Sequence, residues 1–118
     1  MKKLYFLKYG STLEKQKIKV MLEKWDFDFI EHESMYFGVY FKYSGLHADS
    51  LTVKDNKVST PYYEDDEWLD KDNMHFCTLV DVSILDGKNK DKLSKYKFLK
   101  NVFNSGEFSL ISDKCLEK

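Results

Sequence analysis

The chain has 118 residues, of which 16% are aromatic and 33% charged, a composition typical of one folded domain spanning residues 1–118 rather than of a disordered segment. The formal net charge is −1 and all nineteen basic residues are lysine, which argues against general affinity for nucleic acid or an anionic membrane, and against the bidentate phosphate contacts that arginine makes. Two cysteines do not make a disulfide framework, and no apolar run reaches the length of a signal peptide or a membrane span, so a cytoplasmic protein is expected.

The first predicted elements are a strand and a helix. Residues 4–9 are apolar on both faces, which is typical of a strand inside a sheet that is covered on both sides. Ser11 and Glu14 have the spacing of a capping box, so a helix is predicted from there to about Lys24. Its apolar residues recur at helical spacing and predict one stripe that packs on the sheet: Ile18, Met21, Leu22 and Trp25.

Four strands are predicted next. Residues 26–33 alternate polar and apolar, and residues 36–43 are rich in β-prone aromatics, so they are expected to pair antiparallel, with a bulge or a close approach at Gly38. Residues 49–53 and 58–60 flank a turn-like segment and predict a hairpin, which Pro61 closes.

The last predicted elements are a strand at residues 75–85, a helix at residues 91–104 and a short strand at residues 107–111, followed by a polar tail. The element order predicts an α+β fold, with a mostly antiparallel sheet and two amphipathic helices packed on one face. A split β-α-β arrangement with an inserted hairpin fits this order.

An acidic, aromatic stretch lies between the predicted hairpin and the strand at residues 75–85. From residue 64 to 72 it has six carboxylates and one lysine, a local charge of −5. Tyrosine and tryptophan often dominate protein interfaces, and carboxylates around them steer a basic partner. The alternative is a solvated loop that only adds solubility. The candidate partner-binding residues are Tyr62, Tyr63, Glu64, Asp65, Asp66, Glu67, Trp68, Asp70 and Asp72.

A basic segment of opposite sign follows at residues 88–100, with six lysines and one aspartate, a charge of +5. It is interpreted as the solvated side of the second helix; contact with phosphate or lipid headgroups is the alternative. The acidic and basic segments are also candidates to neutralise each other partly within the fold.

Catalytic and metal-binding motifs are not found. The three histidines are widely spaced, and the residues after Asp70 do not follow a calcium-binding loop pattern, so no cofactor and no metal are expected. One enzymatic alternative stays open, in which His47 and His75 meet in space as the acid and base of a small hydrolase acting on RNA or nucleotides. A non-enzymatic protein is nevertheless the preferred interpretation.

The chain resembles the small immunity proteins of bacterial contact-dependent and polymorphic toxin systems. The resemblance lies in the α+β layout, the aromatic segment at residues 36–43, the segment after it to residue 53, and the acidic aromatic stretch. It implies a cytosolic inhibitor, without enzymatic activity, that binds one cognate toxin domain through protein–protein contacts. Such a toxin is often a nuclease with a basic cleft, and the acidic residues 62–72 would be opposite to that cleft in charge. A phage-encoded inhibitor of a host defence nuclease is an alternative with the same physics. Direct binding to nucleic acid or to a membrane is not expected.

Overall fold

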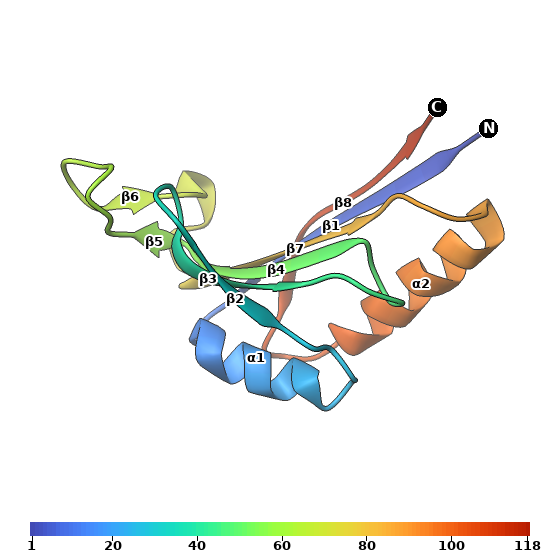
Figure 1. The fold of residues 1–118 in the computed structure, drawn as a ribbon, viewed down its shortest axis with the longest axis horizontal. Helices are drawn as coiled ribbons and strands as arrows, with labels where there is room; N and C mark the ends of the chain where they lie inside the picture. The colour runs from blue at the N-terminus through green and yellow to red at the C-terminus, as the bar shows by residue number, and fades with distance from the viewer.

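The computed structural model describes residues 1–118 and contains one large antiparallel sheet with two helices (Figure 1). Its six strands have the spatial order β2-β3-β4-β7-β1-β8. Their bounds are β1 (Lys3–Ser11), β2 (Ile30–Ser34), β3 (Gly38–Tyr43), β4 (Ser50–Asp55), β7 (Thr78–Ile84) and β8 (Ser109–Glu117). The helices are α1 (Lys15–Glu23) and α2 (Asn89–Val102). The predicted α+β class is therefore confirmed.

Both helices cover the same face of the sheet (Figure 1). The core between the helices and the sheet contains alternate side chains of β1, namely Tyr5, Leu7 and Tyr9, and the central residues of β4 and β7. From α1, Ile18 and Leu22 of the predicted stripe are fully buried and Met21 is half-buried. Trp25 is a wrong prediction, because α1 ends at Glu23 and the Trp25 side chain beyond it is 42% exposed. Neither helix has the length and apolar content needed to cross a bilayer.

The opposite face of the sheet carries no helix, so the prediction that β1 is covered on both sides is wrong. Leu4 and Phe6 point to this face and are only half-buried. The face instead carries ion pairs, such as Lys54 with Asp81 at 3.0 Å. The physical reason is that both connecting helices pack on one side of the sheet, which leaves the other side to polar pairs.

The start of α1 also differs from the prediction. Ser11 is the last residue of β1 and pairs with Thr78 of β7, so it is not available as a cap. Its hydroxyl accepts a hydrogen bond from the Leu13 backbone N–H at 3.1 Å, and Glu14 takes the N-cap position without a side-chain bond. The strand therefore extends two residues further than its apolar pattern indicates, and the predicted capping box does not form.

The β2–β3 pair is confirmed as antiparallel, with Ile30 facing Lys42 and Ser34 facing Gly38. Neither the bulge nor the close approach expected at Gly38 is present, since the β2–β3 register is regular and an added Cβ would meet only Thr60 Cγ2 at 3.7 Å. Gly38 instead begins β3 with a positive φ of 70°, so glycine is needed there for the turn. The first strand of the pair starts at Ile30 instead of at the predicted residue 26. Phe27 is fully buried, but it lies in the loop before β2 and not in a strand.

The predicted hairpin between residues 49–53 and 58–60 does not form. β4 pairs with β3 on one side and β7 on the other, which leaves it no free edge. The following short strand β5 (Lys57–Val58) pairs instead with β6 (Glu67–Trp68), in a separate two-stranded sheet.

The C-terminal strand is longer than predicted, because the polar tail after residue 111 continues β8 to Glu117 along the edge of β1. None of the β8 residues is buried, so this edge strand tolerates polar side chains along its length.

Candidate protein-binding surface

The acidic stretch lies in a lobe, defined here as residues 57–73, that projects from one end of the sheet (Figure 1). It contains β5, β6 and the short 3-10 helix η1 (Lys71–Asn73). The molecule extends 45 × 31 × 25 Å, and the lobe occupies one end of its longest axis (Figure 1). The candidate partner-binding residues are therefore brought together on one projecting element.

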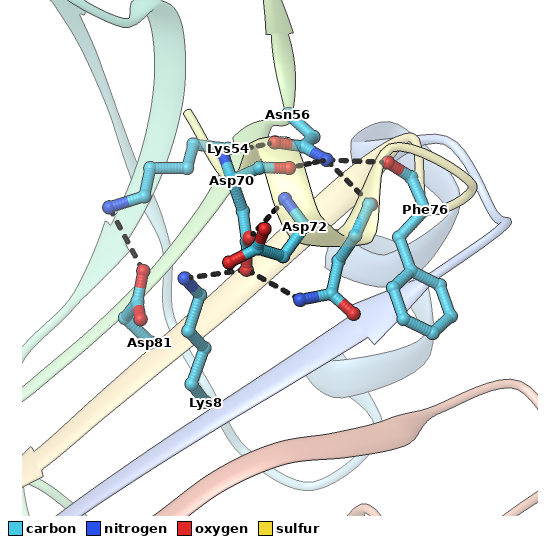
Figure 2. A network of polar contacts seen from close by, with 8 residues as sticks. Lys8, Lys54, Asn56, Asp70, Asp72, Phe76 and Asp81 are labelled. Atoms are coloured by element: carbon cyan, nitrogen blue, oxygen red, sulfur yellow. Dashed lines mark hydrogen bonds and ion pairs between the residues drawn. The ribbon is translucent and has the colours of Figure 1, made fainter. Parts of the chain in front are cut away.

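Asn56 holds the base of this lobe and is fully buried. Its side-chain oxygen accepts a hydrogen bond from the Asp70 backbone N–H at 2.8 Å. Its amide group donates to the carbonyls of Asn73 at 2.9 Å and Phe76 at 3.0 Å (Figure 2). Its own backbone bonds Cys77 and Leu69. The Asn56 side chain thus joins the two ends of the lobe, where the chain leaves β4 and returns to β7, by hydrogen bonds that a regular strand pair would otherwise supply.

Asp70 belongs to the same base and points toward the sheet rather than to solvent (Figure 2). Its carboxylate pairs with Lys8 of β1 at 3.0 Å, accepts from the Asn73 side chain at 2.9 Å, and caps η1 through the Asp72 backbone N–H. Burial acts to raise the pKa of Asp70, but the hydrogen bonds from Lys8 and Asn73 outweigh it and hold that pKa below its ordinary value.

The five other acidic candidates lie on the outside of the lobe and divide into two groups. Asp66 pairs with Lys57 at 3.5 Å, and Glu67 pairs with Lys71 at 3.1 Å. Exposed pairs of this kind contribute little to stability. The remaining three carboxylates form no ion pair within the chain: Glu64, Asp65 and Asp72. Their charge is available to an external cation.

The tyrosines of the stretch pack against the β2–β3 turn, which sequence reasoning did not include in the site. The Tyr63 hydroxyl donates to the Tyr36 carbonyl at 3.1 Å. The Tyr62 ring meets the Tyr36 ring edge-on, with centroids 4.7 Å apart. Tyr62 and Tyr36 still expose 56% and 47% of their surface, and Met35 exposes 61%. These three side chains form an exposed apolar cluster beside the carboxylates.

Trp68 is placed differently from the tyrosines. It is half-buried in β6, and the Lys57 ammonium lies 5.8 Å from its ring centroid, within range of a cation–π contact. Part of its surface is therefore already used within the lobe.

A cleft of about 740 Å³ separates the β2–β3 turn from the start of the lobe. Met35, Pro61 and Tyr62 line it together with small and polar residues of both segments, and Glu33 is its one charged lining residue. The signal in the sequence was the large apolar pair Met35 and Tyr36 at a turn, but their position beside Tyr62 depends on hydrogen bonds between segments 25 to 27 residues apart.

The basic segment at residues 88–100 lies on α2, at the end of the molecule opposite the lobe (Figure 1). No ion pair joins α2 to the lobe, so the two segments do not neutralise each other. Most of its lysines are exposed or half-exposed, but Lys92 is fully buried and its ammonium has no hydrogen-bond partner.

The histidine pair of the hydrolase alternative is not brought together. His47 lies before the first residue of β4 and His75 before the first residue of β7. These two strands are antiparallel, so the histidines flank opposite ends of their ladder, which spans roughly 17 Å at the usual rise per residue. His47 instead stacks on Phe98 of α2, with centroids 4.7 Å apart.

No group of three or more histidine, cysteine, aspartate or glutamate side chains is arranged to hold a metal ion. Comparison of the chain with protein-family models, with curated proteins and with solved structures gave no match.

Proposed function

We propose that the protein is an immunity-type inhibitor that binds and neutralises a cognate toxin domain, with a basic nuclease as the class of toxin. The observation that supports this most directly is the lobe itself. It presents two adjacent carboxylates without internal partners, Glu64 and Asp65, next to the exposed ring of Tyr62. A lobe that served only solubility would not require exposed aromatic rings.

Two physical effects make this surface suited to a basic protein. Unpaired carboxylates at one end of an elongated molecule attract a cationic partner over a distance and raise the association rate. Tyrosine rings held by neighbouring rings lose little conformational freedom on binding, so their burial contributes to affinity.

Within this proposal, Asp70 has a different role from the other acidic candidates. Because its carboxylate is engaged by Lys8 and Asn73, it holds the lobe in place, and the outer carboxylates make the contacts.

The hydrolase alternative required His47 and His75 to lie close together, but they flank opposite ends of the β4–β7 strand pair. A phage-encoded inhibitor of a defence nuclease would use the same surface, so the identity of the partner distinguishes it from the first proposal.

The test begins with the neighbouring genes, because the proposal predicts a toxin gene directly beside this one, and the toxic domain it encodes is the binding partner to use. Neutralisation is measured by co-expression, and association is measured by interferometry at low and at high salt. The double variant Glu64→Lys, Asp65→Lys is expected to lower the association rate at low salt about tenfold and to reduce its salt dependence.

The matched control reverses two exposed carboxylates outside the lobe, Asp28→Lys and Glu107→Lys, which have no ion-pair partner and give the same net charge. Equal loss in both double variants would mean that overall charge alone matters. Unchanged association of the lobe variant would remove the acidic stretch from the interface.

A further inference from the structure

The cleft between the β2–β3 turn and the lobe combines apolar walls with one carboxylate. Its lining residues include Met35, Pro61 and Tyr62, and Glu33 is the one charged residue among them. Glu33 is exposed and forms no ion pair within the chain. A site of this kind fits a side chain with an apolar stem and a cationic head.

The walls of this cleft are tied together at their base. The Thr60 hydroxyl donates to the Met35 carbonyl at 2.6 Å, and the Tyr63 hydroxyl donates to the Tyr36 carbonyl at 3.1 Å. The Tyr63 backbone N–H also bonds the Thr60 carbonyl at 3.1 Å. The two segments are therefore held in one relative position before a ligand arrives, which lowers the entropic cost of binding.

The aromatic side of the cleft is supported as well. The Tyr62 ring makes T-shaped contacts with Tyr36 at 4.7 Å and with Tyr63 at 4.9 Å between ring centroids, while more than half of its own surface stays exposed. An aromatic ring that is held by its neighbours and more than half exposed can take a cation by a cation–π contact.

We propose that this cleft binds an arginine side chain presented by a loop of a basic protein partner. The guanidinium would stack on the Tyr62 ring and pair with the Glu33 carboxylate, while its methylene stem contacts Met35. Arginine suits the cleft better than lysine because its planar cation both stacks on aromatic rings and forms two parallel hydrogen bonds with one carboxylate. A volume of about 740 Å³ leaves space for residues that flank the arginine. This inference rests on the proposed inhibitory function, because it names a chemical feature of the same partner.

The direct test needs no toxin. The full chain, labelled with ¹⁵N, is titrated with the N-acetyl amides of arginine, lysine and leucine, and the amide resonances are followed by NMR. Arginine amide is expected to shift the resonances of Met35, Gly38 and Tyr62 saturably, with a dissociation constant in the millimolar range that is usual for so small a ligand. Equal shifts with lysine amide would overturn the preference for arginine. Equal shifts with leucine amide, or none at the cleft, would overturn the site.

Two variants locate the contacts. Glu33→Gln keeps the shape of the cleft and removes its charge, and is expected to weaken arginine binding several-fold. Tyr62→Leu keeps apolar bulk and removes the aromatic face, with the same expectation. The matched control is Glu31→Gln, an exposed carboxylate two residues earlier on β2 that does not line the cleft, and it is expected to leave binding unchanged. Equal effects of Glu33→Gln and Glu31→Gln would contradict the assignment.

The same variants separate this inference from the proposed function in the neutralisation assay. If Glu33→Gln, which lies outside the lobe, neutralises the toxin as well as the unmodified protein, while the lobe charge reversal does not, the function stands and the cleft is not used. If the arginine titration succeeds but no toxin is neutralised, the cleft stands and the proposed function fails.

Discussion

The side chain of Asn56 is expected to be the most sensitive polar position in the protein, because the lobe has no regular ladder at its base. The change to examine is Asn56→Ala. It removes three short hydrogen bonds, to the Asp70 N–H at 2.8 Å and to the carbonyls of Asn73 at 2.9 Å and Phe76 at 3.0 Å. A weaker contact to the Asp70 carbonyl at 3.4 Å is lost with them.

The size of the effect follows from these contacts. Each hydrogen bond contributes about 1 kcal/mol net, and a buried group left without a partner costs about 1–3 kcal/mol. Water entering the vacated space satisfies some of the freed groups, so the expected loss is about 3–5 kcal/mol of unfolding free energy. Small domains have only about 5–15 kcal/mol in total, so this change would be large.

Two measurements check this prediction. Urea unfolding gives the change in the free energy of unfolding, and amide hydrogen exchange shows where the protein opens. The Leu69 and Asp70 amides, which donate to Asn56, are expected to lose protection more than the amides of β1. The control is Asn101→Ala on the exposed side of α2, where a change within about 0.5 kcal/mol is expected. A loss below about 1 kcal/mol with unaltered exchange at the lobe would refute the assignment of Asn56 as its anchor.

Two further predictions concern charged groups. Lys92→Met is expected to raise the free energy of unfolding by about 1–3 kcal/mol, because the Lys92 ammonium is fully buried without a hydrogen-bond partner; lower stability in urea unfolding would contradict this. Burial acts to raise the pKa of Asp70, but the hydrogen bonds from Lys8 and Asn73 outweigh burial and bring this pKa below the ordinary 3.8. The ionised Asp70 carboxylate therefore stabilises the fold fully above pH 3.8, and this stabilisation disappears as the pH falls through the lower pKa of the folded state. Lys8→Met is expected to move the pKa of Asp70 upward in an NMR titration of its carboxyl carbon, and an unchanged titration would show that Lys8 does not hold it down.

The parts of the fold that followed from the sequence are those with a local physical cause. Ile18 and Leu22 repeat with the helical period and are buried as that period requires, whereas Trp25 of the same predicted stripe lies beyond the helix and is exposed. Alternation and β-prone aromatics likewise located β3, and the antiparallel β2–β3 pair was confirmed. The predicted strand ends were less accurate where only backbone pairing with a neighbouring strand, and no apolar pattern, continues the strand. This occurs at Ser11 of β1 and in the polar half of β8.

The candidate surface could be anticipated only in part. The acidic and aromatic residues at 62–72 are visible as a composition, and they do gather on one lobe. Their individual roles are not visible, because Asp70 looks like any other carboxylate of the stretch until Lys8, 62 residues earlier, is found beside it at 3.0 Å. Likewise, Glu33 and Met35 join Tyr62 only because β2 and β3 bring their turn to the lobe.

The sequence by itself determined the fold class, the buried pair Ile18 and Leu22 of α1, and the concentration of charge at residues 62–72, because each depends on neighbours along the chain. Tertiary structure alone decided that β5 leaves the sheet to pair with β6, that Asn56 anchors the lobe, and that a cleft with a single carboxylate forms beside Tyr62. The physical reason is that a buried polar group bonds whichever partner the fold brings within hydrogen-bond distance. The residues that bond the Asn56 side chain lie 14 to 20 positions away from it along the chain, so the local sequence does not reveal them.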